Sequence, residues 1–187
     1  KYSIKKSGEK IIGKDKNKDM RQMIAIGFNN SKFVWTGKNT LDYKSSIVGN
    51  DYVVAGNCLS SINVLKKTAL YFENNRSIDF PFRLINSIIA GDKAGGHTKK
   101  ISDYSKKLKK NISKSTKSVF SNSWSSALII ASNKPKIWHN LRVDAHSEPL
   151  KELKKILNST ISSAEKLNKF YNAAIEVKPS YWRKIIK

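Results

Sequence analysis

Hydrophobic positions in the first third of the chain come in short runs separated by turn-forming residues, a pattern typical of β-strands. The runs RQMIAIGF (21–28) and KFVWTG (32–37) flank an Asn-Asn-Ser sequence, and asparagine tolerates the backbone angles that turns need. These two runs therefore predict a β-hairpin. NDYVVAGN (50–57) predicts a further strand, which ends at a glycine and an asparagine.

Two later stretches carry apolar residues at helical spacing. In SSINVLKKTALYF (60–72) the apolar positions fall on one helical face. DFPFRLINSIIAG (79–91) has the same spacing, with Asp79 as a candidate N-cap and Gly91 as a candidate stop. Both stretches predict helices that pack one side against a sheet.

The second half of the chain predicts two more strands and a long helix. The strands are WSSALIIA (124–131) and KIWHNLRVD (136–144), and the helix begins at Ser147 and leads into a helical extension over residues 158–187. The elements do not alternate strictly as β-α-β, which favours antiparallel sheets. The expected fold is α/β (α+β), in a single domain over residues 1–187.

Charge adds a second feature to this picture. The formal net charge is +22, and only 5 of the 36 basic residues are arginine. Proteins that recognise base edges depend on arginine, so the lysine excess favours a solvated surface over sequence-specific nucleic-acid binding. Residues 99–123 are low in apolar content and rich in lysine and serine, which predicts an exposed inserted loop.

Several classes of protein are disfavoured by what the sequence lacks. It has no run of eighteen apolar residues and no hydrophobic signal segment, so neither a membrane span nor secretion is expected. Cys58 is the only cysteine, which agrees with a cytoplasmic protein and a buried structural thiol. The three histidines match no local metal-ligand spacing, so no metal site is expected.

The densest set of reactive side chains lies in HNLRVDAHSEPL (139–150). If this stretch begins as a strand, its apolar residues point one way, while Arg142 and Asp144 share the other face and can form an ion pair. One interpretation is a pocket wall in which Asp144 orients His146 or Arg142 binds an anion. The other is an ion pair followed by Ser147 as a helix cap, and the residues alone favour this second interpretation.

Three stretches, taken in order, resemble an uncharacterised Ntn-hydrolase-like family known as domain of unknown function 1028. They are VVAGN (53–57), then GDKAGG (91–96) with SSALII (125–130) after it, and finally LRVDAHSEPLKELKKIL (141–157). The resemblance covers about residues 10–157, and the last stretch is the most specific of the set.

The sequence departs from the family's pattern at three single positions. Ala145 stands where the family usually has a second Asp, His97 where its glycine loop has an Asp, and Asn140 where an Asp often precedes Leu-Arg. The family's first strands, roughly its N-terminal third, are absent from this sequence. The chain is therefore expected to be an N-terminally incomplete fragment.

The resemblance implies an Ntn-hydrolase-like layered αββα sandwich with antiparallel sheets. Ntn hydrolases use an N-terminal Thr, Ser or Cys as nucleophile and base, a role that Lys1 cannot fill. The implied function is hydrolysis of amide bonds by a protein whose nucleophile is missing from this chain, and the residues leave open whether the chain is an enzyme. The expected site residues are catalytic His146, Asp144 and Arg142, and substrate-binding Asn57, Asp92 and His97.

Two non-catalytic alternatives stay open. One is a protein that binds a small anion in the same cleft, and the other is a lysine-driven contact with polyanions or nucleic acid through residues 99–123. The expected partners are an unidentified small-molecule substrate and a second copy of the chain. No cofactor, metal or membrane is expected.

Overall fold

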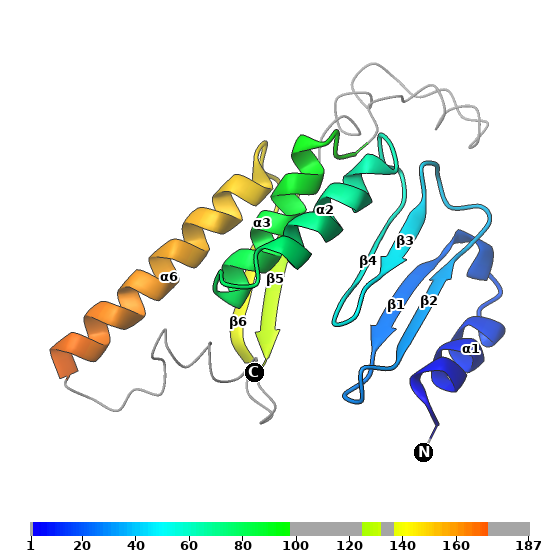
Figure 1. The fold of residues 1–187 in the computed structure, drawn as a ribbon, viewed down its shortest axis with the longest axis horizontal. Coiled ribbons are helices and arrows are strands. Elements are labelled where there is room, and N and C mark those ends of the chain that lie inside the picture. Colours follow the sequence, from blue (N-terminus) through cyan, green and yellow to red (C-terminus); the bar gives the residue numbers. More distant parts are fainter. Residues whose placement is uncertain (1, 98–124, 132–136, 172–187) are drawn as a thin grey trace. The chain divides into compact units, whose positions relative to one another are not determined.

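A computed structural model describes residues 2–97, 125–131 and 137–171 of the chain (Figure 1). These residues fall into two compact units, which are treated one at a time below. Unit 1 comprises residues 2–70 and 90–97, and unit 2 comprises residues 71–89, 125–131 and 137–171. The single domain expected from the sequence stays a prediction.

The described residues contain four α-helices, one short 3-10 helix and six strands, and the strands pair as three antiparallel hairpins. In chain order these elements are α1 (Ile4–Lys14), η1 (Lys18–Met20), β1 (Gln22–Ile26), β2 (Lys32–Thr36), β3 (Ser45–Val48), β4 (Val53–Gly56), α2 (Asn63–Asn74), α3 (Phe80–Lys93), β5 (Ser126–Ala131), β6 (Ile137–Val143) and α6 (Pro149–Tyr171).

In unit 1, helix α1 packs on one side of the β1–β2 hairpin. A Cβ atom on Gly8 would lie 2.4 Å from the ring of Phe33, so glycine is needed for this close approach. Similarly, a Cβ atom on Gly27 would lie 2.7 Å from Ile4. Phe33 pairs with Ala25 across the hairpin, which places their side chains on the same face. Helix α1 therefore covers the odd-numbered side of β1.

The β3–β4 hairpin belongs to the same unit and includes a strand that the sequence pattern did not predict. The stretch 50–57 gave β4, whereas β3 was missed because SSIV has too few apolar residues to form a recognisable run. At the turn end, the side chains of Asn30 and Lys32 both donate hydrogen bonds to the carbonyl of Asn50, at 2.6 and 2.8 Å. These bonds tie the turn of one hairpin to the turn of the other.

Gly91 does not stop helix α3, contrary to the prediction, since the helix continues to Lys93. A Cβ atom on Gly91 would lie 2.2 Å from the hydroxyl of Thr68, which is buried in α2. The glycine thus permits a close approach of two helical segments within unit 1. Asp92, expected just beyond the helix, lies in its last turn and is exposed.

Unit 2 is built on the β5–β6 hairpin and α6, with part of α3 in the core. The buried apolar cluster consists of Ile85, Leu128, Ile130, Val143, Leu153 and Leu157. Burial along β6 alternates as the sequence predicts, with His139 and Val143 buried and Asn140 and Arg142 exposed. The helix begins at Pro149, two residues after the predicted start.

Two predicted segments lie partly or wholly outside the described residues. The lysine-rich insertion over residues 99–123 lies wholly outside them, and so does the part of the 158–187 extension that follows Tyr171. Among the helices that are described, none combines the length and the hydrophobicity needed to cross a membrane.

Candidate functional site

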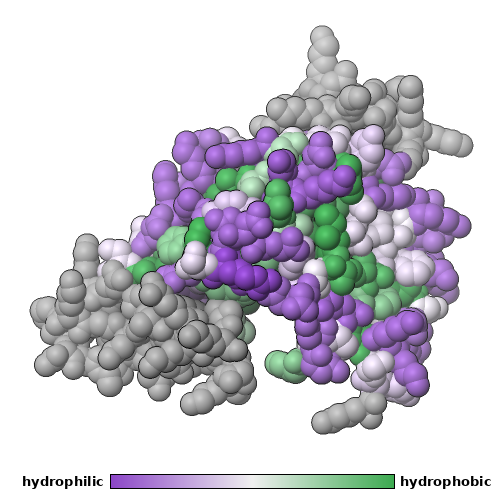
Figure 2. Space-filling model, in the orientation of Figure 1, coloured by the Kyte–Doolittle hydropathy of each residue, from purple (hydrophilic) through white to green (hydrophobic). Residues whose placement is uncertain are grey.

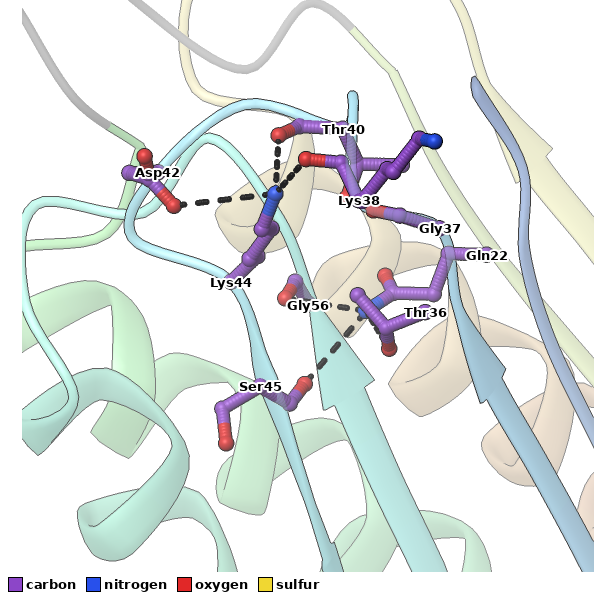
Figure 3. Close-up of polar contacts among 9 residues, drawn as sticks. All are labelled: Gln22, Thr36, Gly37, Lys38, Thr40, Asp42, Lys44, Ser45 and Gly56. Carbon is purple, nitrogen blue, oxygen red and sulfur yellow. Dashed lines mark hydrogen bonds and ion pairs between the residues drawn. The ribbon is translucent and has the colours of Figure 1, made fainter. Parts of the chain in front are cut away.

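Asn57 is held by a polar network centred on Gln22, the first residue of β1. The Gln22 amide nitrogen donates to the Thr36 hydroxyl at 3.1 Å, and it also lies within hydrogen-bonding distance of two backbone carbonyls, those of Gly56 (3.1 Å) and Ser45 (3.4 Å) (Figure 3). Its amide oxygen accepts a hydrogen bond from Asn57 Nδ2 at 3.0 Å. One side chain therefore joins the open ends of both hairpins and fixes a predicted site residue.

A second polar cluster in unit 1 surrounds Lys44, which directly precedes β3. Its ammonium group donates to the carbonyls of Lys38 and Thr40, and Asp42 Oδ1 lies 3.9 Å away (Figure 3). The Thr40 hydroxyl in turn donates to the carbonyl of Gly37 at 2.7 Å. The sequence does not predict this cluster, because nothing in the pattern separates Lys44 from the other lysines of a lysine-rich chain.

The other two predicted residues of unit 1 lie where the chain after β4 meets the chain after α3. Leu59 forms an antiparallel bridge with His97, and the backbone N–H of Ser60 donates to the carbonyl of Gly96 at 3.0 Å. Asp92 is close to the same segment, since its Oδ1 lies 2.6 Å from where a Cβ atom of Gly96 would be. The structure therefore brings Asp92 and His97 near the segment that begins at Asn57.

Burial lowers the pKa of His97 in this region. The side chain is half-buried, and desolvation lowers its pKa below the ordinary value of 6.5, so the neutral imidazole is favoured. The neighbouring Cys58 is 1% exposed and adopts a φ of 58°, and its backbone N–H donates to the carbonyl of Leu41 at 2.8 Å. The thiol is buried, as the sequence analysis expected.

In unit 2, Arg142 and Asp144 form the expected ion pair at the end of β6. Arg142 Nε donates to Asp144 Oδ2 at 2.5 Å, and the two side chains are 71% and 52% exposed. The hydrogen bond from Arg142 to Asp144, reinforced by charge attraction, raises the pKa of the guanidinium further. The pair lies on the strand face opposite the buried Val143.

His146 makes a hydrogen bond that the sequence did not predict. Its Nδ1 accepts a hydrogen bond from the backbone N–H of Glu148 at 3.0 Å, which caps the start of α6. The cap is thus His146 and not Ser147. Among the described residues, Asp144 is hydrogen-bonded to Arg142 and no hydrogen bond joins it to His146, so the expected orienting contact is not present.

The backbone between these two residues explains the difference. Strand β6 ends at Val143, and Ala145 has a φ of 52°, in the left-handed region that non-glycine residues rarely adopt. This turn takes His146 out of the alternating row that Arg142 and Asp144 share. The period-two pattern therefore predicted the ion pair but not the direction of the residue after the turn.

His139 is a further histidine that the sequence placed on the apolar face of β6. It pairs with Ile130 of β5 and is buried. Desolvation lowers the pKa of His139 below 6.5, so the imidazole is favoured in its neutral form. Across the residues that the structure describes, no group of three or more His, Cys, Asp or Glu side chains is arranged to hold a metal ion.

The six predicted site residues thus form two local sets. Asn57, Asp92 and His97 belong to unit 1, and Arg142, Asp144 and His146 belong to unit 2. Each set is fixed by contacts within its own unit. The described residues make a mixed α/β fold with small antiparallel sheets and four α-helices.

Comparison with known proteins identifies the family. Residues 1–110 match the model described as "Family of unknown function (DUF1028)", and because this is more than half of the chain, the chain belongs to that family. A search of curated proteins found no match.

A solved structure supports the same relationship at the level of the fold. The crystal structure of a protein from Silicibacter pomeroyi, described with the same family name, resembles this chain with a TM-score of 0.64 and 20% sequence identity. The likeness covers 82% of this chain and 56% of that chain. This chain therefore spans little more than half of its structural neighbour, and at this identity the likeness concerns the fold alone.

Proposed function

We propose that the chain is part of an amide hydrolase of the N-terminal-nucleophile type, with a layered αββα sandwich whose first strands and nucleophile lie outside these 187 residues. In this proposal the end of β6 binds the substrate. The expected resemblance of residues 141–157, which lie outside the family match over residues 1–110, motivates the position of the site, and the hydrogen bonds of Arg142 and His146 support its chemistry. We further propose that the protein acts in the cytoplasm, in keeping with its single buried cysteine.

The observation that carries the proposal is the hydrogen bond that His146 Nδ1 accepts from the backbone of Glu148. Nδ1 accepts a hydrogen bond from Glu148, so in the neutral imidazole the proton must be on Nε2. His146 is then a donor toward a substrate and not a general base. Arg142, four residues earlier, adds the N–H donors of its guanidinium at the same end of β6, and such donors suit a carboxylate or a developing oxyanion.

The test uses the complete gene product and an amide library containing matched pairs of substrates with and without a carboxylate. We expect turnover, and we expect Arg142→Gln to raise KM about tenfold for the carboxylate substrates while leaving the neutral ones unchanged. Arg142→Lys should restore part of the loss. Turnover that persists when the N-terminal Thr, Ser or Cys is replaced by Ala would refute the nucleophile, and no turnover of any amide would refute the hydrolase.

A second candidate is a non-catalytic protein that binds a small anion at the same residues. The exposure of Arg142 and the donor state of His146 favour it, because neither feature requires a nucleophile. Here Asp144→Asn is informative, since it removes the negative charge beside the guanidinium. Stronger binding of inorganic phosphate or citrate by this variant, measured by calorimetry, would support anion binding, whereas loss of amide turnover in the same variant would support the hydrolase.

A further inference from the structure

Strand β1 has one side covered by α1 and another side on which Gln22 contacts β3 and β4 while Ile24 and Ile26 stay exposed. The contacts of Gly27 with Ile4 and of Gly8 with Phe33 place α1 on the odd-numbered side. Ile24 and Ile26 point to the other side because strand side chains alternate. They are 44% and 47% exposed, and Phe28, just past the strand, is fully exposed. We call Ile24, Ile26 and Phe28 the outer strip.

Three large apolar side chains at alternate positions of one segment are unlike the scattered single hydrophobic residues that normal surfaces carry. The residues beside the strip are polar at its two ends, since Lys32 pairs with Ile26 and Thr36 pairs with Gln22. Figure 2 shows hydrophobic residues at the surface over the strands of unit 1. A polar rim around an apolar centre is typical of a surface that another polypeptide covers.

The sheet itself is also small. Hairpin β1–β2 is a two-stranded sheet, and such hairpins are marginally stable until further strands or a helix pack against them. Helix α1 covers the odd-numbered side, and on the other side β3 and β4 contact Gln22 but leave Ile24 and Ile26 exposed. The structural neighbour contains polypeptide that has no counterpart in this chain, because the likeness covers only 56% of the neighbour.

We infer that the outer strip is the packing surface for polypeptide of the same protein that lies outside these 187 residues. The occupant is an apolar strand or strand pair corresponding to part of the neighbour that this chain does not cover. The inference rests on the proposal above that strands of the fold lie outside this chain. The inference adds to that proposal the residues that those strands cover.

Cysteine labelling tests the inference cleanly, because the one native thiol, Cys58, is 1% exposed. Ile26→Cys and, separately, Ile24→Cys are made in the 187-residue chain and in the complete gene product. Ile11→Cys, at an exposed position of α1, is the matched control. We expect a maleimide to label the strip variants rapidly in the 187-residue chain and at least tenfold more slowly in the complete protein, with equal labelling of the control in both.

Three results would overturn the inference. The first is equally fast labelling of the strip variants in both proteins, and the second is a gene that encodes no further residues beyond an initiator methionine. The third is protection in the 187-residue chain that grows with its concentration, since a second copy would then be the occupant. Labelling does not depend on turnover, so protection without amidase activity would leave this inference standing while the hydrolase proposal fails.

Discussion

Replacement of Gln22 by leucine should weaken unit 1 more than its half-exposed position suggests. The Gln22 amide nitrogen has two protons for three acceptors, and its oxygen accepts one bond from Asn57. Gln22→Leu keeps roughly the same volume and removes about three hydrogen bonds, each worth about 1 kcal/mol. Because two backbone carbonyls also lose a donor, we expect the free energy of unfolding of unit 1 to fall by about 2–4 kcal/mol.

Two matched variants separate the parts of this network. Gln22→Glu keeps the acceptor for Asn57 but has no amide protons, so it should lose most of the same stability. Asn57→Ala removes only the bond to the Gln22 oxygen and should cost about 1 kcal/mol. In the double variant Gln22→Leu/Asn57→Ala the second change should add almost nothing, which gives a coupling energy of about 1 kcal/mol.

Amide hydrogen exchange of the β1–β4 strands under native conditions measures these changes within unit 1. The strands should exchange faster in Gln22→Leu, while the amides of β5 and β6 in unit 2 should be unchanged and serve as an internal control. If Gln22→Leu exchanges within about 0.5 kcal/mol of the native chain, the network does not stabilise the hairpins. Additive effects of the two single variants would show that Gln22 and Asn57 do not interact.

Three further predictions concern unit 2. Ala145→Gly should raise the free energy of unfolding by about 0.5–1 kcal/mol in urea denaturation, because a φ of 52° is strained for alanine. A free energy of unfolding below that of the native chain would contradict the left-handed turn. His146→Leu should cost about 1 kcal/mol by loss of the cap, while His146→Asn, which keeps an acceptor, should cost less; equal costs would show that Nδ1 is not a cap. Burial lowers the pKa of His139 in the folded state below 6.5. Below pH 6.5 the unfolded chain therefore binds a proton that the folded chain does not. The free energy of unfolding should be highest above pH 6.5 and should fall as the pH drops below it. Measured by urea denaturation from pH 7.5 to 5, His139→Gln should reduce that fall in unit 2. If the free energy of unfolding falls with pH as steeply as in the native chain, His139 is not the cause.

The sequence predicted the elements whose residues contact near neighbours along the chain. The β1–β2 hairpin, β4, the three later helices and β6 follow from period-two and helical patterns, and the Arg142–Asp144 pair follows from alternation within a single strand. The boundary at Gly91 was wrong because the glycine is required by an approach of Thr68, from another helix, and not by the end of its own. Such a requirement leaves no local pattern.

The same difference between local and distant contacts decides which features of the site could be predicted. Gln22 and Asn57 are 35 residues apart, and no periodicity connects them, so the residue that holds Asn57 could be found only in three dimensions. The direction of His146 depends on one backbone angle, that of Ala145, and alanine gives no signal of a left-handed turn in the way that glycine or asparagine would. Glycine, asparagine or aspartate at this position would have indicated the turn.

The contacts that fix the end of β6 also limit its chemistry. Asp144 is hydrogen-bonded to Arg142, so it reduces the positive charge that an incoming anion would meet, and the two side chains act together as a dipole more than as a cation. His146 Nδ1 accepts a hydrogen bond from the backbone N–H of Glu148, so this nitrogen is not directed at a substrate. In the proposed hydrolase, the base must therefore come from another group, such as the α-amino group of the proposed N-terminal nucleophile. In that proposal the end of β6 binds the substrate, and other residues transfer its protons.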